Sequence, residues 1–456
     1  MSFLSELPSK KILVVGAGVT GSAVVRYLQS IGHKNFIILD ERAADVEGVS
    51  VVNKILAPDF DLAIVSPGWK QENPIFADLR QASVEIIGEL DFAWRLRQEI
   101  APEQKWLALT GTNGKTTTVQ MVESIFQAAG IHGIACGNVG TTVIEALQTD
   151  PIHDVLVIEL SSFQIQWSNE ARFETVAILN LADDHIDWHG SFESYANAKI
   201  SLLEMSKRAV LNLSDPEIVL RSTSWNGEKI FFGLDTPNSG EVGLVENLLV
   251  DRAFSESDSA AEVIAELTDI NPAVPHNVMN ALAAAALALS YGISHESVRA
   301  GLSSFMPDHH RLELVHESNG ISWVNDSKAT NPHAALAALG SYLSVIWIAG
   351  GLAKGARMDS LISRAASRVK AAILIGEDRE IIASSLKNIA PEIPVFFIDK
   401  SGTSMAMMEA VVAKAAELAE SGDTVLLAPA CASMDQFTSY AQRGEFFAQS
   451  VKRLNP

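Results

Sequence analysis

Short runs of β-branched and aliphatic residues alternate along the chain with longer segments in which apolar residues recur at helical spacing. In the first hundred residues the runs KILVV, NFIIL, LAIV and VEII predict strands, and VVRYLQS predicts a helix after the first of them. Strands that alternate with helices are typical of parallel sheets joined by crossover helices. The pattern therefore predicts an α/β fold.

The same alternation continues through the rest of the chain. The runs WLALT, VLVIEL, TVAILNL and RAVLNL predict a second sheet, and ISWV, SVIWIAG, AAILIG, PVFFI and DTVLLA predict a third. Between them, HNVMNALAAAALALSYG predicts a helix, and the polar, proline-containing segment 95–105 indicates a domain junction. We therefore predict three α/β domains: a Rossmann-like domain (1–99), a central domain like those of P-loop ATPases (100–307) and a second Rossmann-like domain (308–456).

Composition agrees with several domains and narrows the class of partner. The chain has 456 residues, more than a single core usually holds, with 48% hydrophobic and 20% charged residues. Its net charge of −21, from 55 acidic and 34 basic side chains, argues against binding to nucleic acid or to an anionic membrane. The two cysteines, Cys136 and Cys431, have no CxxC spacing, which argues against a disulfide scaffold or a zinc site.

Targeting signals are not evident in the sequence. The N-terminal residues MSFLSELPSKK lack a basic region followed by an apolar run, and the most apolar helical stretch, ALAAAALAL, is far shorter than a bilayer crossing requires. We therefore expect a soluble, cytoplasmic protein without membrane insertion.

The stretch WLALTGTNGKTTT has the order of residues that a nucleotide-binding loop needs. Glycines after a strand let backbone N–H groups converge on phosphate oxygens, a lysine reaches the terminal phosphates, and the hydroxyl of Thr116 can bind Mg²⁺. The core pattern GxxGKT is complete, although Leu109 stands where the full motif has its first glycine. A plain strand–turn–helix is the alternative. The expected nucleotide-binding residues are Gly111, Thr112, Asn113, Gly114, Lys115, Thr116, Thr117 and Thr118.

Acidic and histidine side chains follow the next predicted strands. Glu159 ends the run VLVIE, where a carboxylate can contact Mg²⁺, although a strand-end acid can also simply face solvent. The segment LADDHIDWHG gathers Asp183, Asp184, His185, Asp187 and His189. Such a cluster is suited to Mg²⁺ or Mn²⁺, and a solvated acidic turn is the alternative.

A second glycine loop, GAGVTG, lies near the N-terminus. Gly16, Gly18 and Gly21, followed by Asp40 after the next predicted strand, match the dinucleotide-binding pattern. Alone, this loop would favour an NAD-dependent oxidoreductase, which leaves the Lys115 loop and the Asp/His segment unexplained. A P-loop ATPase that acts on DNA is at odds with the acidic charge.

Motifs in a fixed order extend this picture. TGTNGKTTT, GNVGTTV, VIELSSFQ, ILNLADDHIDWHGSFESYANAK, HNVMNALAA, VNDSKATNP and LLAPACASMDQF cover the chain from about 105 to 443. Together they resemble the Mur ligase family. The resemblance implies ATP-dependent amide-bond synthesis in peptidoglycan assembly, with UDP-N-acetylmuramoyl-L-alanine and D-glutamate as the expected substrates. A sister Mur ligase or an enzyme like folylpolyglutamate synthetase is the alternative.

The chemistry that this resemblance implies has two steps. The alanine carboxylate attacks the γ-phosphate of ATP to form an acyl phosphate, and the amine of D-glutamate then displaces phosphate. Phosphorylation supplies a good leaving group, and positive charge must offset the crowding of carboxylate and triphosphate.

The resemblance also implies roles for central residues. Lys115 would contact the β- and γ-phosphates, Thr116 and Glu159 would hold one Mg²⁺, and His185 a second. Lys199, which the sequence alone indicates as a helix-surface lysine, would be carbamylated by CO₂ to become a metal ligand. Asn138 would orient the nucleotide-sugar or the phosphate.

Further roles fall on later segments by the same resemblance. Asn277 and Asn280, three residues apart on one helix face, would contact adenine. Arg311 would reach the γ-phosphate and Asp326 the ribose. The residues that would form the D-glutamate pocket are Lys328, Thr330, Lys354, Ser433 and Tyr440.

The first glycine loop would hold the UDP diphosphate, because a helix N-terminus binds any diphosphate. The residues that would line the rest of this site are Val19, Thr20, Glu41, Arg42, Ser66 and Gly68. Three positions depart from the family pattern: Pro275 and Ala353 replace a usual glycine and a usual acid, and Tyr440 replaces a phenylalanine. We expect a monomer.

Overall fold

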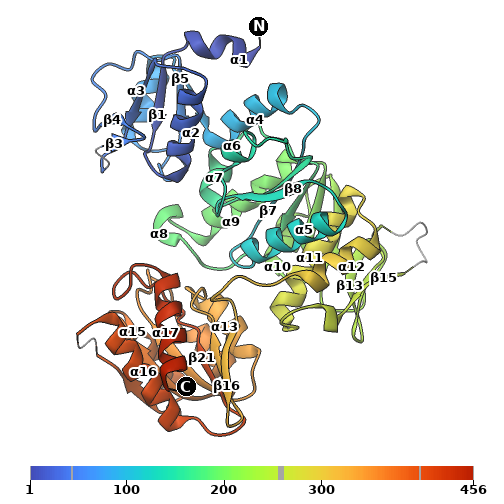
Figure 1. Ribbon diagram of the computed structural model, residues 1–456, viewed down its shortest axis with the longest axis vertical. Helices are drawn as coiled ribbons and strands as arrows, with labels where there is room; N and C mark the ends of the chain where they lie inside the picture. The colour runs from blue at the N-terminus through green and yellow to red at the C-terminus, as the bar shows by residue number, and fades with distance from the viewer. Residues whose placement is uncertain (1, 43–44, 255–260, 400–401, 455–456) are drawn as a thin grey trace. The chain divides into compact units, whose positions relative to one another are not determined.

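The computed structural model describes residues 2–42, 45–254, 261–399 and 402–454. The chain divides into two compact units. The first comprises Met1–Leu181, Glu193–Ile270 and Val278–Phe305, and the second Ala182–Phe192, Asn271–Asn277 and Met306–Pro456. In the described residues the first unit holds two parallel-rich sheets and the second holds one, each covered by helices (Figure 1). The predicted α/β class with three sheets is confirmed.

The N-terminal sheet has the strand order β3-β4-β2-β1-β5-β6 and is parallel apart from the β3–β4 pair. β1 and β5 are buried along their whole length, which explains why both are continuous apolar runs. The strands are β1 (Ile12–Val15), β2 (Phe36–Leu39), β3 (Asp45–Val46), β4 (Val49–Val52), β5 (Leu62–Val65) and β6 (Glu85–Gly88). The helices are α1 (Phe3–Glu6), η1 (Leu7–Ser9), α2 (Val19–Ser30), α3 (Pro74–Gln81) and α4 (Glu89–Ile100).

The segment 95–105, expected as a domain junction, is not a loop over most of its length. α4 continues to Ile100, and β7 begins at Lys105. Only the four residues 101–104 lie between these two elements. The predicted boundaries at 99 and 307 stay predictions.

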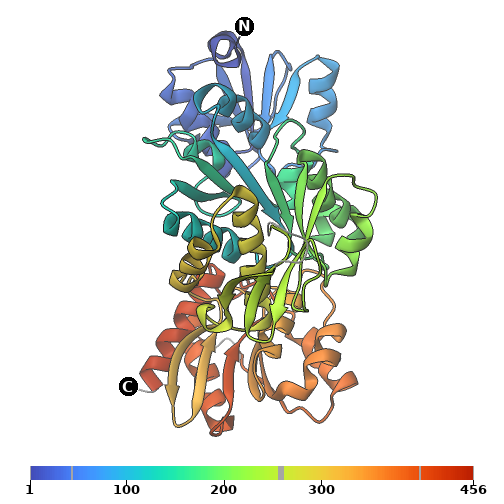
Figure 2. The same ribbon diagram turned by 90° about the vertical axis from the view of Figure 1, so that its right-hand side faces the viewer.

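The central sheet has nine strands in the order β15-β14-β13-β12-β11-β10-β7-β9-β8. It is parallel from β8 to β13 and antiparallel in the β13–β14–β15 extension, whose yellow-green strands are seen in Figure 2. The sequence patterns missed β8 and β12 to β15. The strands are β7 (Lys105–Thr110), β8 (Gly133–Gly137), β9 (Val155–Glu159), β10 (Thr175–Ile178), β11 (Arg208–Asn212), β12 (Glu228–Phe232), β13 (Glu241–Val245), β14 (Leu248–Asp251) and β15 (Glu262–Glu266).

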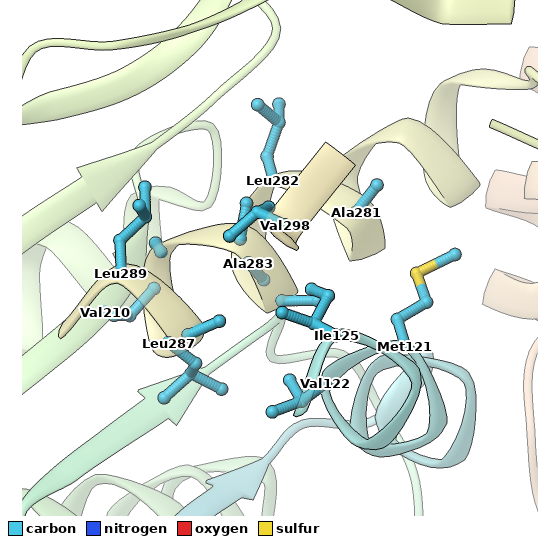
Figure 3. Packing of buried hydrophobic residues seen from close by; sticks show 14 of the residues in the cluster. Met121, Val122, Ile125, Val210, Ala281, Leu282, Ala283, Leu287, Leu289 and Val298 are labelled. Atoms are coloured by element: carbon cyan, nitrogen blue, oxygen red, sulfur yellow. The ribbon is translucent and has the colours of Figure 1, made fainter. Parts of the chain in front are cut away.

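Helix α5 of this domain packs closely against α11 and α12. Met121, Val122 and Ile125 of α5 point toward these helices in Figure 3. A Cβ atom on Gly301 of α12 would lie 2.4 Å from the Cα of Ile125, so this close contact requires a glycine. The helices of this part of the chain are α5 (Lys115–Ala128), α6 (Val143–Ala146), α7 (Ser162–Gln166), α8 (Ile186–His189), α9 (Phe192–Ile200), η2 (Ser201–Met205), α10 (Pro216–Arg221), η3 (Leu267–Asp269), α11 (Pro275–Tyr291) and α12 (His295–Ser304). Of these, α8 belongs to the second compact unit.

The C-terminal sheet has the order β16-β17-β21-β18-β19-β20 and is parallel apart from the β16–β17 pair. Its strands are β16 (Glu313–Ser318), β17 (Ile321–Asn325), β18 (Val345–Gly350), β19 (Val369–Ile375), β20 (Val395–Phe397) and β21 (Thr424–Leu427). Its helices are α13 (Pro332–Gly340), α14 (Asp359–Ala365), η4 (Ala366–Arg368), α15 (Arg379–Ile389), α16 (Ser404–Leu418) and α17 (Tyr440–Leu454). Among the helices described, none is both long enough and apolar enough to span a bilayer.

Candidate functional site

The first glycine loop lies where β1 ends and α2 begins. Gly16 has a φ of 99°, and a Cβ there would lie 2.7 Å from the Cβ of Ser66. A Cβ on Gly21 would lie only 1.9 Å from the carbonyl oxygen of Gly16. β1 and its neighbour β5 are the strands at which the chain reverses direction across the sheet, and ligands bind at such a switch point. The N-terminus of α2 therefore opens at the expected ligand-binding edge.

Asp40 shapes this loop. Its Oδ2 accepts a hydrogen bond from the backbone N–H of Ala17 (2.8 Å), and its Oδ1 accepts one from Arg42 (2.8 Å). The predicted neighbours are accessible: Val19 is 71% exposed, and Glu41 and Arg42 are exposed. The other predicted residues of this group are the exposed Gly68, the half-buried Thr20 and the buried Ser66.

Two asparagines lie against the central loop. Asn180, just after β10, accepts a hydrogen bond from the N–H of Asn113 (2.8 Å) and donates one to its carbonyl oxygen (3.0 Å). Gly114 has a φ of 83°, and a Cβ there would lie 2.4 Å from Oδ1 of Asn280. The sequence did not single out Asn180, although its place after a parallel strand next to β7 was a usable signal.

Lys115 lies over its own loop. Its Nζ donates to the carbonyl oxygens of Gly111 (2.8 Å) and Thr112 (3.0 Å). Thr116 is half-buried in the first turn of α5, and Thr117 and Thr118 are buried. To reach the terminal phosphates of a nucleotide, the Nζ of Lys115 must leave these two carbonyl oxygens and donate to phosphate oxygens instead.

Glu159 lies at the end of β9, next to β7, with only 2% of its surface exposed. The Nδ2 of Asn138 donates to Oε1 of this carboxylate at 2.9 Å, and the backbone N–H of Asn138 donates to the Glu159 carbonyl (2.9 Å). The other carboxylate oxygen, Oε2, is buried without a hydrogen-bond partner. Because a buried carboxylate oxygen without a partner is costly, this position is suited to a divalent cation.

Lys199 is 2% exposed, contrary to the surface position that the sequence alone indicated. Its Nζ donates to Oγ1 of Thr110 (3.1 Å) and to the carbonyl oxygen of Gly111 (3.0 Å), and lies 4.9 Å from the ring centroid of Tyr195. The Tyr195 hydroxyl in turn lies 2.9 Å from Oγ1 of Thr112. α9 thus places Lys199 directly against the central loop.

The second unit contains the acidic and histidine segment 182–192. His185 has a left-handed φ of 52°, and its Nε2 lies 3.6 Å from Oδ2 of Asp184. In the part of the chain that the structure describes, no three His, Cys, Asp or Glu side chains gather as a metal site. The segment is therefore not a preformed metal cage.

The C-terminal sheet brings most of the predicted D-glutamate residues to one edge. β17, β21 and β18 are adjacent and parallel, so their carboxyl ends meet. Asp326, Lys328 and Thr330 follow β17, Lys354 follows β18 with a φ of 50°, and Ser433 and Tyr440 follow β21. The Nζ of Lys328 lies 3.9 Å from the ring centroid of Tyr440, a cation–π distance.

Two predicted ATP-binding residues have structural partners of their own. Oδ1 of Asp326 accepts a hydrogen bond from the N–H of Leu312 (3.2 Å). Burial raises the pKa of Asp326 to about 7, against the opposing effects of that N–H group and of Arg311. Asn277 is buried, and its Nδ2 donates to the carbonyl oxygens of Asn271 (3.2 Å) and Pro272 (3.0 Å).

Arg443 is a residue that the sequence did not single out. It is fully buried and donates hydrogen bonds to Oγ and the carbonyl oxygen of Ser327 and to the carbonyl oxygens of Cys431 and Gly350. These partners follow or end β17, β21 and β18. Burial lowers the pKa of Arg443 to about 10. A single guanidinium thus joins the three strand ends.

Comparisons with known proteins assign this arrangement to a family. The model of the Mur ligase middle domain matches residues 109–288, and the model of the Mur ligase glutamate ligase domain matches residues 310–431. A Streptomyces coelicolor protein named UDP-N-acetylmuramoylalanine–D-glutamate ligase is 45% identical over 472 residues, which cover 99% of each chain. A Thermobifida fusca protein of the same name is 45% identical over 467 residues, covering 98% of this chain and 99% of its own.

Solved structures show the same fold. A pseudomurein peptide ligase type C from Methanothermus fervidus superposes with a TM-score of 0.62 at 20% identity, over 98% of this chain and all of that one. A UDP-N-acetylmuramate–alanine ligase from Thermotoga maritima gives 0.58 at 20% identity, with the same coverage.

Proposed function

The chain belongs to the Mur ligase family, and on that premise we propose that it adds D-glutamate to UDP-N-acetylmuramoyl-L-alanine, with conversion of ATP to ADP and phosphate. It is an ATP-dependent ligase of peptidoglycan precursor synthesis. The observation that carries the proposal is that one compact unit holds two glycine loops, each in front of a helix N-terminus. Two such loops suit a reaction that binds a nucleoside triphosphate and a nucleoside-diphosphate sugar together.

The first loop holds the UDP part of the substrate in this proposal. The N–H groups at the start of α2 bind the diphosphate, and Asp40 keeps the loop open for it through Ala17. The exposed Val19 offers an apolar contact to the uracil ring. The remaining contacts come from Gly16, Gly18, Thr20, Gly21, Glu41, Arg42, Ser66 and Gly68.

The central loop holds ATP. Backbone N–H groups of the loop from Gly111 to Gly114 surround the phosphates, and Lys115 turns from its carbonyl contacts to the β- and γ-phosphates. Asn138 orients the substrate beside Glu159. The adenosine and the γ-phosphate are contacted by Thr112, Asn113, Thr116, Thr117, Thr118, Asn277, Asn280, Arg311 and Asp326.

The reaction joins two carboxylate-bearing substrates. An oxygen of the alanine carboxylate forms a bond to the γ-phosphorus, and ADP leaves. The neutral amine of D-glutamate then attacks the acyl carbon, phosphate leaves, and the nitrogen loses a proton to give the amide. Positive charge from Lys115 reduces the repulsion between carboxylate and triphosphate.

Divalent metal fits this site because of Glu159. Its buried Oε2 needs a positively charged partner, and the hydroxyl of Thr116 is at the start of α5. Thr116 and Glu159 would hold one Mg²⁺ and His185 a second, a carbamate on Lys199 would be a further oxygen ligand, and the ions would supply positive charge near the phosphates. The carbamate forms when the neutral Nζ of Lys199 attacks CO₂ and releases a proton.

The C-terminal domain supplies the D-glutamate pocket in this proposal. D-glutamate carries two carboxylates, and Lys328 and Lys354 follow β17 and β18, the strands on either side of β21. Thr330, Ser433 and Tyr440 complete the pocket. We also propose that the chain folds as three domains, 1–99, 100–307 and 308–456. It acts as a monomer in the cytoplasm, where ATP and UDP-linked precursors occur.

Phosphate release with Mg²⁺-ATP and UDP-N-acetylmuramoyl-L-alanine tests this function. We expect release with D-glutamate only, together with a product heavier by one glutamyl residue. Parallel reactions contain L-glutamate, L-lysine, meso-diaminopimelate or no amino acid. Release with another amino acid would assign the chain to a sister ligase. The identity of the amino acid needs this direct test because Ala353 and Tyr440 depart from the family pattern. No release in any reaction would overturn the proposal.

A further inference from the structure

Glu89 is a buried acid that the proposed chemistry does not use. It is the first residue of α4, directly after β6, and only 3% of its surface is exposed. Its Oε1 accepts a hydrogen bond from Nε2 of Gln164 in the central domain (3.1 Å). Its Oε2 is buried without a hydrogen-bond partner. An acid in such a position costs stability, so its presence calls for another explanation.

Gln164 connects Glu89 to the central site. Its Oε1 accepts hydrogen bonds from the backbone N–H and the hydroxyl of Ser161 (both 3.0 Å), and Ser161 caps α7. The two ends of the Gln164 amide therefore bind Glu89 and Ser161. Ser161 is two residues after Glu159, so the chain of contacts ends at the turn that leaves the candidate metal-binding carboxylate.

Among the described residues, no Lys, Arg or His side chain is found to stabilise a negative charge on Glu89. Asp91 of the same helix and the Cys136 thiol of β8 interact with it electrostatically, and the neutral Gln164 of α7 donates a hydrogen bond to it. Asp91 is held by the N–H groups of Asn169, Glu170 and Ala171 (2.8, 3.0 and 3.1 Å). Burial, with a smaller contribution from Asp91, raises the pKa of Glu89 to about 7. Both protonation states are therefore present near neutral pH.

We propose that Glu89 is a positioning residue of the ligase, which holds the Gln164 amide and through it the Ser161-capped turn beside Glu159. The inference rests on the proposed function. An ionised carboxylate is a stronger acceptor than a neutral acid, so ionised Glu89 holds Gln164 more firmly. The same ionisation destabilises the fold, because the charge is buried beside Asp91. Activity and stability therefore respond to this group with opposite signs.

The test compares Glu89→Gln with the wild type from about pH 6 to about pH 8.5. The substituted amide keeps an oxygen acceptor for Gln164 but cannot ionise. We expect its kcat to equal that of the wild type near pH 6 and to fall to about one third of it near pH 8.5, because a charge-assisted hydrogen bond is lost. Over the same range its Tm should rise above that of the wild type, and its KM for D-glutamate should not change.

Glu89→Leu removes the acceptor altogether and should lower kcat about tenfold at every pH. The single variant Gln164→Leu and the double variant Glu89→Leu/Gln164→Leu complete the comparison. The kcat of the double variant should fall no further than that of the less active single variant, since both changes break the same chain of contacts. Glu99→Gln, at the other end of α4, where Glu99 accepts the N–H of Leu4 (3.1 Å), is the matched control and should behave as the wild type does.

The outcomes separate the two proposals. A wild type without D-glutamate ligase activity contradicts the proposed function. The positioning role is contradicted if the wild type is active but the kcat and Tm of Glu89→Gln, each relative to the wild type, change in the same direction with pH. It is also contradicted if neither of them changes.

Discussion

Asn138 and Glu159 form a one-sided pair: Nδ2 of the asparagine donates to Oε1 of the carboxylate at 2.9 Å, and Oε2 remains buried without a hydrogen-bond partner. The asparagine thus fixes the orientation of the acid while leaving one oxygen for a cation. The same carboxylate lies beside the strand that leads into the Lys115 loop. This geometry makes Glu159 the most direct place to test the metal-dependent chemistry.

Glu159→Gln should abolish metal-dependent turnover and leave the fold intact. The amide has almost the same shape but no charge, so we expect kcat to fall at least about a hundredfold and Mg²⁺-dependent ATP binding to weaken in equilibrium dialysis. The Tm should stay equal or rise, because a buried charge is removed. Glu123→Gln, which changes a half-buried acid of α5 that accepts the N–H of Ala135 (3.1 Å), is the control. Full activity in Glu159→Gln would exclude its metal role.

Lys199→Ala should lose most activity and regain part of it with added short carboxylates. Acetate or formate can occupy the volume of the missing carbamate and supply its oxygen ligands. We expect a loss of about a hundredfold or more, measured as phosphate release with and without acetate. The exposed Lys105, which lies 3.2 Å from Glu174, supplies the control Lys105→Ala. An Lys199→Ala variant that needs no rescue would contradict the carbamate.

Substitutions at two glycines of the first loop should have different effects, one on the stability of the fold and the other on substrate binding. A Cβ on Gly21 meets the carbonyl oxygen of Gly16 at 1.9 Å, whereas a Cβ on Gly18 has no heavy atom within 4 Å. Gly21→Ala should therefore lower the Tm. Gly18→Ala should keep the Tm but raise the KM for UDP-N-acetylmuramoyl-L-alanine about tenfold, because the methyl group blocks the approach of the diphosphate to the helix N-terminus. Unchanged substrate binding in Gly18→Ala would place the diphosphate elsewhere.

Arg443→Met should weaken both the fold and D-glutamate binding. The carbonyl oxygens of Ser327, Cys431 and Gly350 would lose their buried donor, a loss of about 2–4 kcal/mol of unfolding free energy in urea titrations. The KM for D-glutamate should rise more than the KM for ATP. Arg453→Met, on the exposed side of the same helix, is the control. Equal changes of both KM values would contradict a role in arranging the three strand ends.

His295 makes stability depend on pH. Its Nε2 lies 3.0 Å from Oδ2 of Asp251, and this hydrogen bond is the main cause of its raised pKa. The stabilisation is fully present below the unfolded pKa of 6.5 and is lost as the pH rises through the folded pKa. His295→Gln should therefore cost about 1 kcal/mol near pH 5.5 and almost nothing near pH 8.5 in urea titrations. An equal cost at both pH values would contradict the charged pair.

Much of the candidate site could be predicted because its residues follow strands in the sequence. A loop after a parallel strand lies at the carboxyl edge of its sheet, so Gly16, Gly111 and Glu159 could be placed from local pattern alone, whereas Lys328 was expected only from the family resemblance. The edge strands β12 to β15 were missed. Their short runs mix buried positions with half-buried or exposed ones, unlike the continuous apolar runs of the central strands.

The sequence by itself determined the α/β class, the two glycine loops and the strand-end acids, because each depends on neighbours only a few residues away. Only the tertiary structure decided that Lys199 is buried against Gly111, that Asn180 holds Asn113, that Arg443 joins three strand ends, and that Glu89 binds Gln164. These contacts join residues far apart in the chain. They exist because strand order and helix packing bring those residues together, and residue type at a single position carries no information about either.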